Sequence, residues 1–218
     1  RRHTKLIQSS LKMNIHAKSI YEALKNSIDN NGRASFVVSG GSSPVKIFND
    51  LSKSDLDWSK VSITLVDDRV VSSEHPDSNE RLLKENLFIN NASVAKFISL
   101  KSDSEEVMNI NRPFDIMLLG MGEDGHFASL FPELVDNSNY FDLSANPEII
   151  FTEPMGNPCH KRVSMNLSMI MKSKKIILLV SSSAKLILVD QALENKYLPI
   201  HFLLNQQTKD IEIIKTYT

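Results

Sequence analysis

A glycine-rich segment with three ionisable side chains follows a short apolar run in the middle of the chain. The run, residues 116–119, ends at Gly120, and Glu123, Asp124 and His126 follow within seven residues. A short apolar run bounded by glycine is typical of a buried parallel strand. Glycines let the backbone approach a ligand, and ligands of open α/β sheets bind at the carboxyl ends of strands. We therefore interpret this segment as a site.

A second glycine segment, residues 39–44, lies between an apolar strand, residues 34–38, and a helical pattern, residues 45–51. Free backbone N–H groups and the start of a helix present partial positive charge, and Pro44 suits a first helical position. The arrangement is typical of a phosphate cradle, although it matches neither standard nucleotide-binding glycine motif. A tight connection without a ligand is the alternative.

Charged residues also follow two other predicted strands. Asp67, Asp68 and Arg69 end the strand at 61–66, and Lys185 lies in the first turn of the helix that follows the strand at 175–180. Buried acids need partners, so we expect the first group to contact each other and a ligand rather than form a solvated salt bridge. A lysine at a helix start opposes the macrodipole, so either the position tolerates this small unfavourable effect or an anion lies nearby.

The elements that must position these groups alternate along the chain. The pattern predicts a Rossmann-like, doubly wound, mostly parallel α/β sheet with helices on both faces, in one domain over residues 1–218. Right-handed crossovers then place all four clusters at one sheet edge. Further helices are expected at 10–31, 80–87 and 184–193, a helical face within 162–171, a surface loop or short irregular helix at 133–147, and strands at 93–100, 149–152, 198–204 and 211–214.

Composition narrows the functional classes. The formal net charge of −1 provides no basic surplus for non-specific nucleic-acid binding. The single cysteine, Cys159, allows no disulfide within the chain and fits a reducing compartment, so we expect a cytoplasmic protein. No apolar run approaches the roughly 20 residues that span a bilayer. A nucleophilic pair of Cys159 and His160 is disfavoured because adjacent loop residues rarely aim at each other.

Taken together, the motifs resemble the 6-phosphogluconolactonase family over nearly the whole chain. They are SGGSSP at 39–44, VDDR at 66–69 with DSN at 77–79, LLGMGEDGHFASLFP at 118–132, KRVSMNLSMI at 161–170, and the lysine after the strand at 175–180. The related glucosamine-6-phosphate deaminases typically continue the third motif into Asn-Glu-Pro, which this chain lacks. The family usually has Glu at position 68, a Pro-Arg-(Ile/Val)-Thr-Leu-Thr-like run around 161–166, and a glycine where Ser181 to Ser183 stand here.

The resemblance implies hydrolysis of 6-phosphogluconolactone to 6-phosphogluconate in the oxidative pentose phosphate pathway, without a metal or another cofactor. Histidine, with an ordinary pKa of about 6.5, suits a general base, and the family motif places that role on His126. Asp124 or Asp67 would orient its imidazole. Arg162 would contact the phosphate or the carbonyl oxygen. The residues expected to hold the phosphate are Gly40, Gly41, Ser42, Arg69 and Lys185.

Two other functions use the same features. One is a glucosamine-6-phosphate deaminase or isomerase with an enolising base, and the other is a sugar-phosphate-binding module without catalysis. The expected partner in each case is a small phosphosugar, with no nucleic acid and no membrane. We expect a monomer or a weak homo-oligomer.

Overall fold

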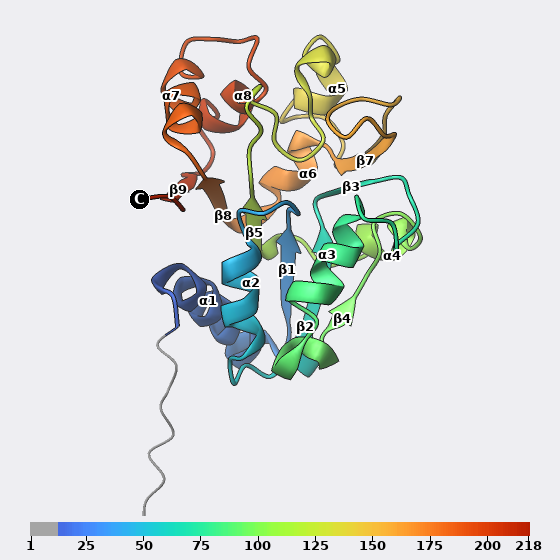
Figure 1. Ribbon diagram of the computed structural model, residues 1–218, viewed down its shortest axis with the longest axis vertical. Helices are drawn as coiled ribbons and strands as arrows, with labels where there is room; N and C mark the ends of the chain where they lie inside the picture. Colours follow the sequence, from blue (N-terminus) through green and yellow to red (C-terminus); the bar gives the residue numbers. More distant parts are fainter. Residues whose placement is uncertain (1–12) are drawn as a thin grey trace, which may run out of the picture.

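The computed structural model describes residues 13–218 and is organised around a six-stranded sheet (Figure 1). All neighbouring strands are parallel, in the order β4-β2-β1-β5-β8-β9. The strands are β1 (Ala34–Val38), β2 (Val61–Leu65), β4 (Lys96–Phe97), β5 (Phe114–Leu119), β8 (Ser173–Val180) and β9 (Glu212–Lys215).

Chain order along this sheet corresponds to 3-2-1-4-5-6, the order of doubly wound Rossmann-type folds. The winding direction reverses between β1 and β5, which pair directly. Ligands of such sheets bind at the carboxyl ends of the strands beside this reversal. The segments that leave β1 and β5 there are the two glycine segments of the sequence. The predicted fold class is confirmed.

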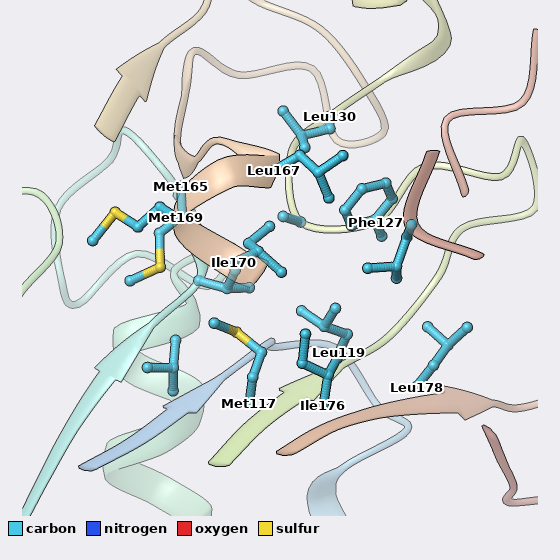
Figure 2. Packing of buried hydrophobic residues seen from close by; sticks show 14 of the residues in the cluster. Met117, Leu119, Phe127, Leu130, Met165, Leu167, Met169, Ile170, Ile176 and Leu178 are labelled. Carbon is cyan, nitrogen blue, oxygen red and sulfur yellow. The ribbon is translucent and has the colours of Figure 1, made fainter. Parts of the chain in front are cut away.

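Helices cover both faces of the sheet (Figure 1). Side chains of β5 alternate: Ile116 and Leu118 pack into the core with α1, α2 and α3, whereas Met117 and Leu119 pack into the core with α6 and α8 (Figure 2). Both cores share one sheet, which supports the single domain that we propose. The helices are α1 (Ile15–Asn31), α2 (Val45–Ser52), α3 (Asn79–Asn86), α4 (Ser104–Met108), α5 (Ser138–Phe141), α6 (Leu167–Met171), α7 (Ser183–Gln191) and α8 (Ile200–Leu204).

A second, antiparallel sheet lies beyond the carboxyl ends of the main strands. It contains β3 (Asp67–Arg69), β7 (Arg162–Met165) and β6 (Ile149–Phe151), in that order. Because β3 follows β2 after one residue, the acidic pair and Arg69 are strand residues rather than a loop. This sheet brings segments almost a hundred positions apart into register.

Local sequence signals explain several element ends. Gly32, with φ of 74°, ends α1 in the left-handed conformation that favours glycine. The Ser78 side chain caps α3, and Ser182 caps α7. Within residues 13–218, no helix is long and apolar enough to cross a membrane.

Four local predictions need correction. Residues 198–204 do not form a strand, because they contain α8, which starts after Pro199. Residues 162–165 form β7 before the short helix α6. Residues 93–100 contain the end of a 3-10 turn and only the two-residue strand β4. The helix expected from residue 10 starts at Ile15, and its predicted first residues up to 12 lie outside the described part of the chain.

Candidate active site

His126 lies in a tight turn after β5, beside the acid two positions earlier. Asp124 Oδ1 accepts a hydrogen bond from the His126 backbone N–H at 3.1 Å and lies 2.5 Å from His126 Nδ1. The turn is closed by Gly122 N–H donating to the His126 carbonyl at 2.8 Å, and Gly125 has a φ of 80°. The local sequence alone therefore produces the histidine–aspartate contact.

The protonation of this pair follows from the carboxylate. Burial raises the pKa of Asp124, but the hydrogen bond from His126 and its charge outweigh burial and bring the pKa below its ordinary value. An ionised carboxylate only accepts, so the Nδ1 atom of His126 that faces Asp124 carries a proton. The histidine side chain is 30% exposed, so Nε2 is available to a solvent molecule or substrate.

Two neighbours restrict the imidazole further. A Cβ added at Gly122 would lie 2.1 Å from His126 Cε1 and 2.2 Å from Nδ1, so the ring occupies space that only glycine leaves. On the other side, the ring lies against Phe131, with centroids 4.5 Å apart and planes at 33°. The histidine is thus positioned by a glycine, an acid and an aromatic ring.

Arg69 and Arg162 are paired across the antiparallel strands β3 and β7. Among the described residues, neither guanidinium forms a salt bridge; backbone carbonyls hold them instead. Arg69 Nη1 donates to the Asp77 carbonyl at 2.8 Å, and Arg162 Nη2 donates to the Pro158 carbonyl at 2.6 Å. The Arg69 Nε is buried without a hydrogen-bond partner. Two adjacent cations without a paired acid favour an anionic ligand.

Burial of Arg162 beside a second arginine disfavours its charged form. Its side chain is almost fully buried, and burial followed by the charge of Arg69 lowers the pKa of Arg162. The guanidinium carbon lies 5.4 Å from the Phe131 ring centroid, and Phe131 also contacts His126. Phe131 therefore connects the arginine pair to the histidine.

Asp67 does not contact His126 through any hydrogen bond in the described structure. Its Oδ2 accepts from Ser129 Oγ at 2.6 Å, and Ser129 N–H donates to Ser164 Oγ at 3.2 Å. Burial raises the pKa of Asp67, which the Ser129 hydrogen bond partly opposes. The acid fixes the segment after His126 to the small sheet.

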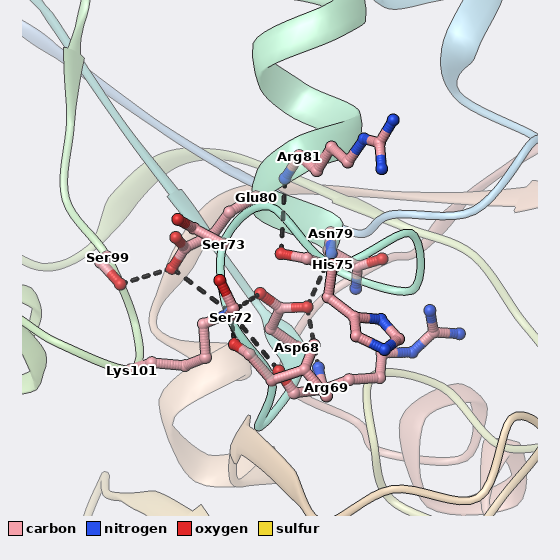
Figure 3. A network of polar contacts seen from close by, with 12 residues as sticks. Asp68, Arg69, Ser72, Ser73, His75, Asn79, Glu80, Arg81, Ser99 and Lys101 are labelled. Atoms are coloured by element: carbon pink, nitrogen blue, oxygen red, sulfur yellow. Dashed lines mark hydrogen bonds and ion pairs between the residues drawn. The ribbon is translucent and has the colours of Figure 1, made fainter.

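Asp68, beside it, is completely buried in a separate network (Figure 3). Lys101 Nζ lies 2.8 Å from its Oδ2 as an ion pair, and Oδ1 accepts from the backbone N–H groups of Arg69 and Asn79 at 2.8 and 2.7 Å. Burying a charge is costly unless it is paired, so Lys101 stabilises this part of β3. The ion pair between Lys101 and Asp68 thus holds the Arg69 backbone in place, because Asp68 Oδ1 accepts from the Arg69 N–H.

The glycine segment after β1 adds further donors. The backbone N–H groups of Gly40, Gly41 and Ser42 donate no hydrogen bond to any described residue, as a phosphate cradle requires. A Cβ at Gly40 would lie 2.0 Å from Asn79 Oδ1, and Gly41 has a φ of 82°. Asn79 Nδ2 donates to the Asp67 carbonyl at 3.1 Å, so the glycine segment packs against the start of α3, which is itself bonded to the start of β3.

Lys185 and Arg69 follow strands on opposite sides of β5, the strand that leads to His126. Lys185 follows β8, whereas His126 follows β5 and Arg69 follows β2. Its Nζ donates to Ser181 Oγ at 3.1 Å. The lysine therefore shares the predicted sheet edge but makes no contact with the arginine pair.

The structure thus joins His126 to Asp124 and Arg69 to Arg162, and it separates Asp67 and Lys185 from both contacts. The sequence analysis missed the roles of four residues, namely Asn79, Lys101, Ser129 and Phe131. Ser129 and Phe131 lie inside the histidine motif at 118–132, but the motif by itself does not indicate a separate role for either residue. Asn79 is part of the DSN motif at 77–79, whereas Lys101 lies in a polar segment without any motif.

Comparison with known proteins identifies the family of this chain. The family model described as glucosamine-6-phosphate isomerases/6-phosphogluconolactonase matches residues 9–212. The chain therefore belongs to this family. Its relatives include a protein of Neisseria meningitidis serogroup A, named 6-phosphogluconolactonase, which is 37% identical over 205 residues that cover 88% of each chain.

A second relative with that name, from Caulobacter vibrioides, is 31% identical over 209 residues, which cover 91% of this chain and 90% of the relative. The crystal structure of a 6-phosphogluconolactonase from Shewanella baltica superposes with a TM-score of 0.85 at 36% identity, covering 93% of this chain and 91% of that chain. The resemblance to 6-phosphogluconolactonase predicted from the motifs is confirmed.

Proposed function

We propose that this chain is an enzyme that hydrolyses 6-phospho-D-glucono-1,5-lactone to 6-phosphogluconate, the reaction of the oxidative pentose phosphate pathway after which its relatives are named. One observation carries the proposal: a histidine bonded to an acid contacts the same aromatic ring, Phe131, as Arg162, which belongs to the pair of arginines without a salt bridge. A proton acceptor and an anion site thus lie close together at the sheet edge where such folds bind ligands.

In the proposed mechanism, Nε2 of His126 takes a proton from a water molecule as the water oxygen attacks the lactone carbonyl. The carbonyl oxygen becomes an oxyanion in the tetrahedral intermediate. Asp124 stabilises the imidazolium formed at this step. The intermediate then collapses, the bond between the carbonyl carbon and the ring oxygen breaks, and the imidazolium returns the proton to that oxygen.

The phosphate is the remote anchor in this proposal. Arg69 and the free N–H groups of Gly40, Gly41 and Ser42 bind it, because a dianion needs charged donors and fixed amides. Arg162, which contacts both Arg69 and Phe131, either completes the phosphate site or faces the carbonyl oxygen. Lys185 closes the site from the β8 side.

The deciding experiment compares two reactions of the purified chain. We expect loss of 6-phosphogluconolactone above its spontaneous hydrolysis and no ammonia release from glucosamine 6-phosphate. The opposite result would establish the deaminase function. Equal affinity for the phosphorylated and the dephosphorylated lactone would contradict the phosphate anchor.

His126→Ala separates an enzyme from a binding module. General-base catalysis contributes about 100- to 10,000-fold, so turnover should fall by that factor while 6-phosphogluconate binding changes little. His16→Ala, which alters a half-buried histidine of α1, is the control and should keep the parent rate. Unchanged turnover in His126→Ala removes this residue from the mechanism.

The remaining features of the proposal concern the protein as a whole. We propose a cytoplasmic enzyme with a single domain that acts as a monomer or a weak homo-oligomer. The formal charge of −1 supports the absence of a nucleic-acid partner. Sedimentation at several protein concentrations tests the oligomeric state.

A further inference from the structure

Two histidines and an aspartate outside the proposed mechanism meet at the rim of the small sheet. His75 and Asp77 lie between β3 and α3, and His160 lies two residues before the start of β7. His160 Nε2 is 2.8 Å from Asp77 Oδ2, and His75 Nδ1 is 3.8 Å from the same oxygen. One potential ligand atom from each residue lies within 4.8 Å of the other two. All three side chains are partly exposed, so an ion has access.

The two distances to the aspartate bracket the spacing of ligand atoms in a tetrahedral zinc centre. Zinc bonds of about 2.0–2.1 Å to nitrogen and oxygen place neighbouring ligand atoms about 3.3 Å apart in a tetrahedron. The two observed distances, 2.8 and 3.8 Å, lie on either side of that value. Two imidazoles and one carboxylate also form a ligand set that zinc prefers, with a fourth position left for water.

One ring nitrogen of each histidine already points at Asp77, where a metal ion would bind. His75 Nδ1 accepts a hydrogen bond from the Asp77 backbone N–H at 3.0 Å, so the lone pair of Nδ1 faces Asp77. His160 Nε2 donates to the Asp77 carboxylate, and an ion would replace that proton. The Asp77 N–H contact to His75 would be given up on binding.

The two segments that supply these ligands also hold the arginine pair. The Asp77 carbonyl accepts from Arg69 at 2.8 Å, and the Pro158 carbonyl, two residues before His160, accepts from Arg162 at 2.6 Å. We propose that His75, Asp77 and His160 bind one zinc ion, which joins the segments on which both arginines rest. The ion has a structural role here, so its binding can be tested without substrate and independently of the proposed hydrolysis.

The test is a titration of chelator-treated protein with Zn²⁺ by calorimetry, with Co²⁺ as a spectroscopic substitute. We expect one ion per chain. His75→Gln and His160→Gln should each weaken binding by at least about 100-fold, because loss of an outer-shell partner alone costs 10–100-fold. His16→Gln, on α1, is the matched control and should bind as the parent does.

Two further measurements keep the result interpretable. Zinc should raise the thermal unfolding midpoint of the parent and of His16→Gln but not that of His75→Gln, because only a bound ion stabilises the folded state. His126→Gln should retain binding, which separates this cluster from the other histidine–aspartate pair. The proposal is overturned if the parent binds no zinc, if the double variant of His75 and His160 binds as the parent does, or if His126→Gln abolishes binding.

Discussion

The substitution of Gly122 by alanine tests the position of His126, the proposed general base, with a single methyl group. Gly122 has no positive φ, so alanine fits its backbone. Its Cβ would nevertheless lie 2.1 Å from His126 Cε1 and 2.8 Å from Asp124 Oδ1. Ordinary contact begins at 3.4 Å, so the ring must move by about 1.3 Å, away from both the glycine and the acid. The 2.5 Å contact between the two side chains does not survive such a shift.

A misplacement of about 1 Å costs on the order of 100-fold in rate, and loss of the whole base contribution costs up to about 10,000-fold. We therefore expect Gly122→Ala to lower kcat by about 100-fold or more. KM for the lactone should change little, since the arginine pair is not displaced. Steady-state hydrolysis of the lactone, corrected for the spontaneous reaction, measures both constants.

Gly120 provides the matched control two residues earlier. It is also half-buried, has no positive φ, and a Cβ there would meet nothing within 4 Å. Gly120→Ala should keep the parent kcat and unfold at or slightly above the parent midpoint, because alanine restricts the unfolded chain. Gly122→Ala should remain folded but unfold somewhat below the parent midpoint, because its Cβ displaces the ring. A Gly122→Ala enzyme with unchanged kcat and a displaced ring, or an equal loss in Gly120→Ala, would refute the reasoning.

Three further predictions concern the supporting residues. Arg69→Ala should raise KM more than it lowers kcat in steady-state assays, because the arginine binds a group remote from the reaction; a pure kcat effect contradicts this role. Burial raises the pKa of Asp67, so its contribution to stability is complete below the unfolded value of about 3.8 and is lost as pH rises through the folded value. Asp67→Asn, which keeps an acceptor for Ser129, should therefore gain unfolding free energy over the parent as pH rises above about 3.8, until a plateau; urea denaturation at several pH values measures this, and a pH-independent difference argues against it. Lys101→Met leaves Asp68 buried and unpaired and should cost about 3–5 kcal/mol of stability, which the added change Asp68→Asn largely restores; no loss in the single variant shows that the ion pair is dispensable.

The parallel sheet was predictable because its signals are local. In the parallel sheet, β1, β2, β5 and β8 are mostly apolar runs that are followed within two residues by glycine, serine or acid, and alternation with helices implies parallel pairing. The apolar run at 198–204 was wrongly predicted as a strand from the same kind of signal. Short apolar runs do not distinguish strand from helix. Here the run forms α8 after Pro199, and the side chains of His201 and Asn205 bond to the Ala192 carbonyl at the end of α7.

The two halves of the candidate site differ in the same way. Asp124 and His126 are two residues apart, and the glycine turn between them produces their contact, so one motif contains the whole arrangement. The sequence left Asp67 as an equal candidate because only the fold shows that its carboxylate is taken by Ser129.

The proposed anion site depends on pairing between distant segments. Arg69 and Arg162 become neighbours only through the antiparallel register of β3 and β7, and no periodicity in either short strand specifies that register. Gly156 shows how tightly the result is built: with φ of 77°, its missing side chain leaves room for Phe131 Cζ and Arg162 Nη2, which a Cβ would approach to 2.6 and 2.8 Å. The turn around Gly156 therefore sets how closely Arg162 and Phe131 pack, and through Phe131 it links the anion site to His126.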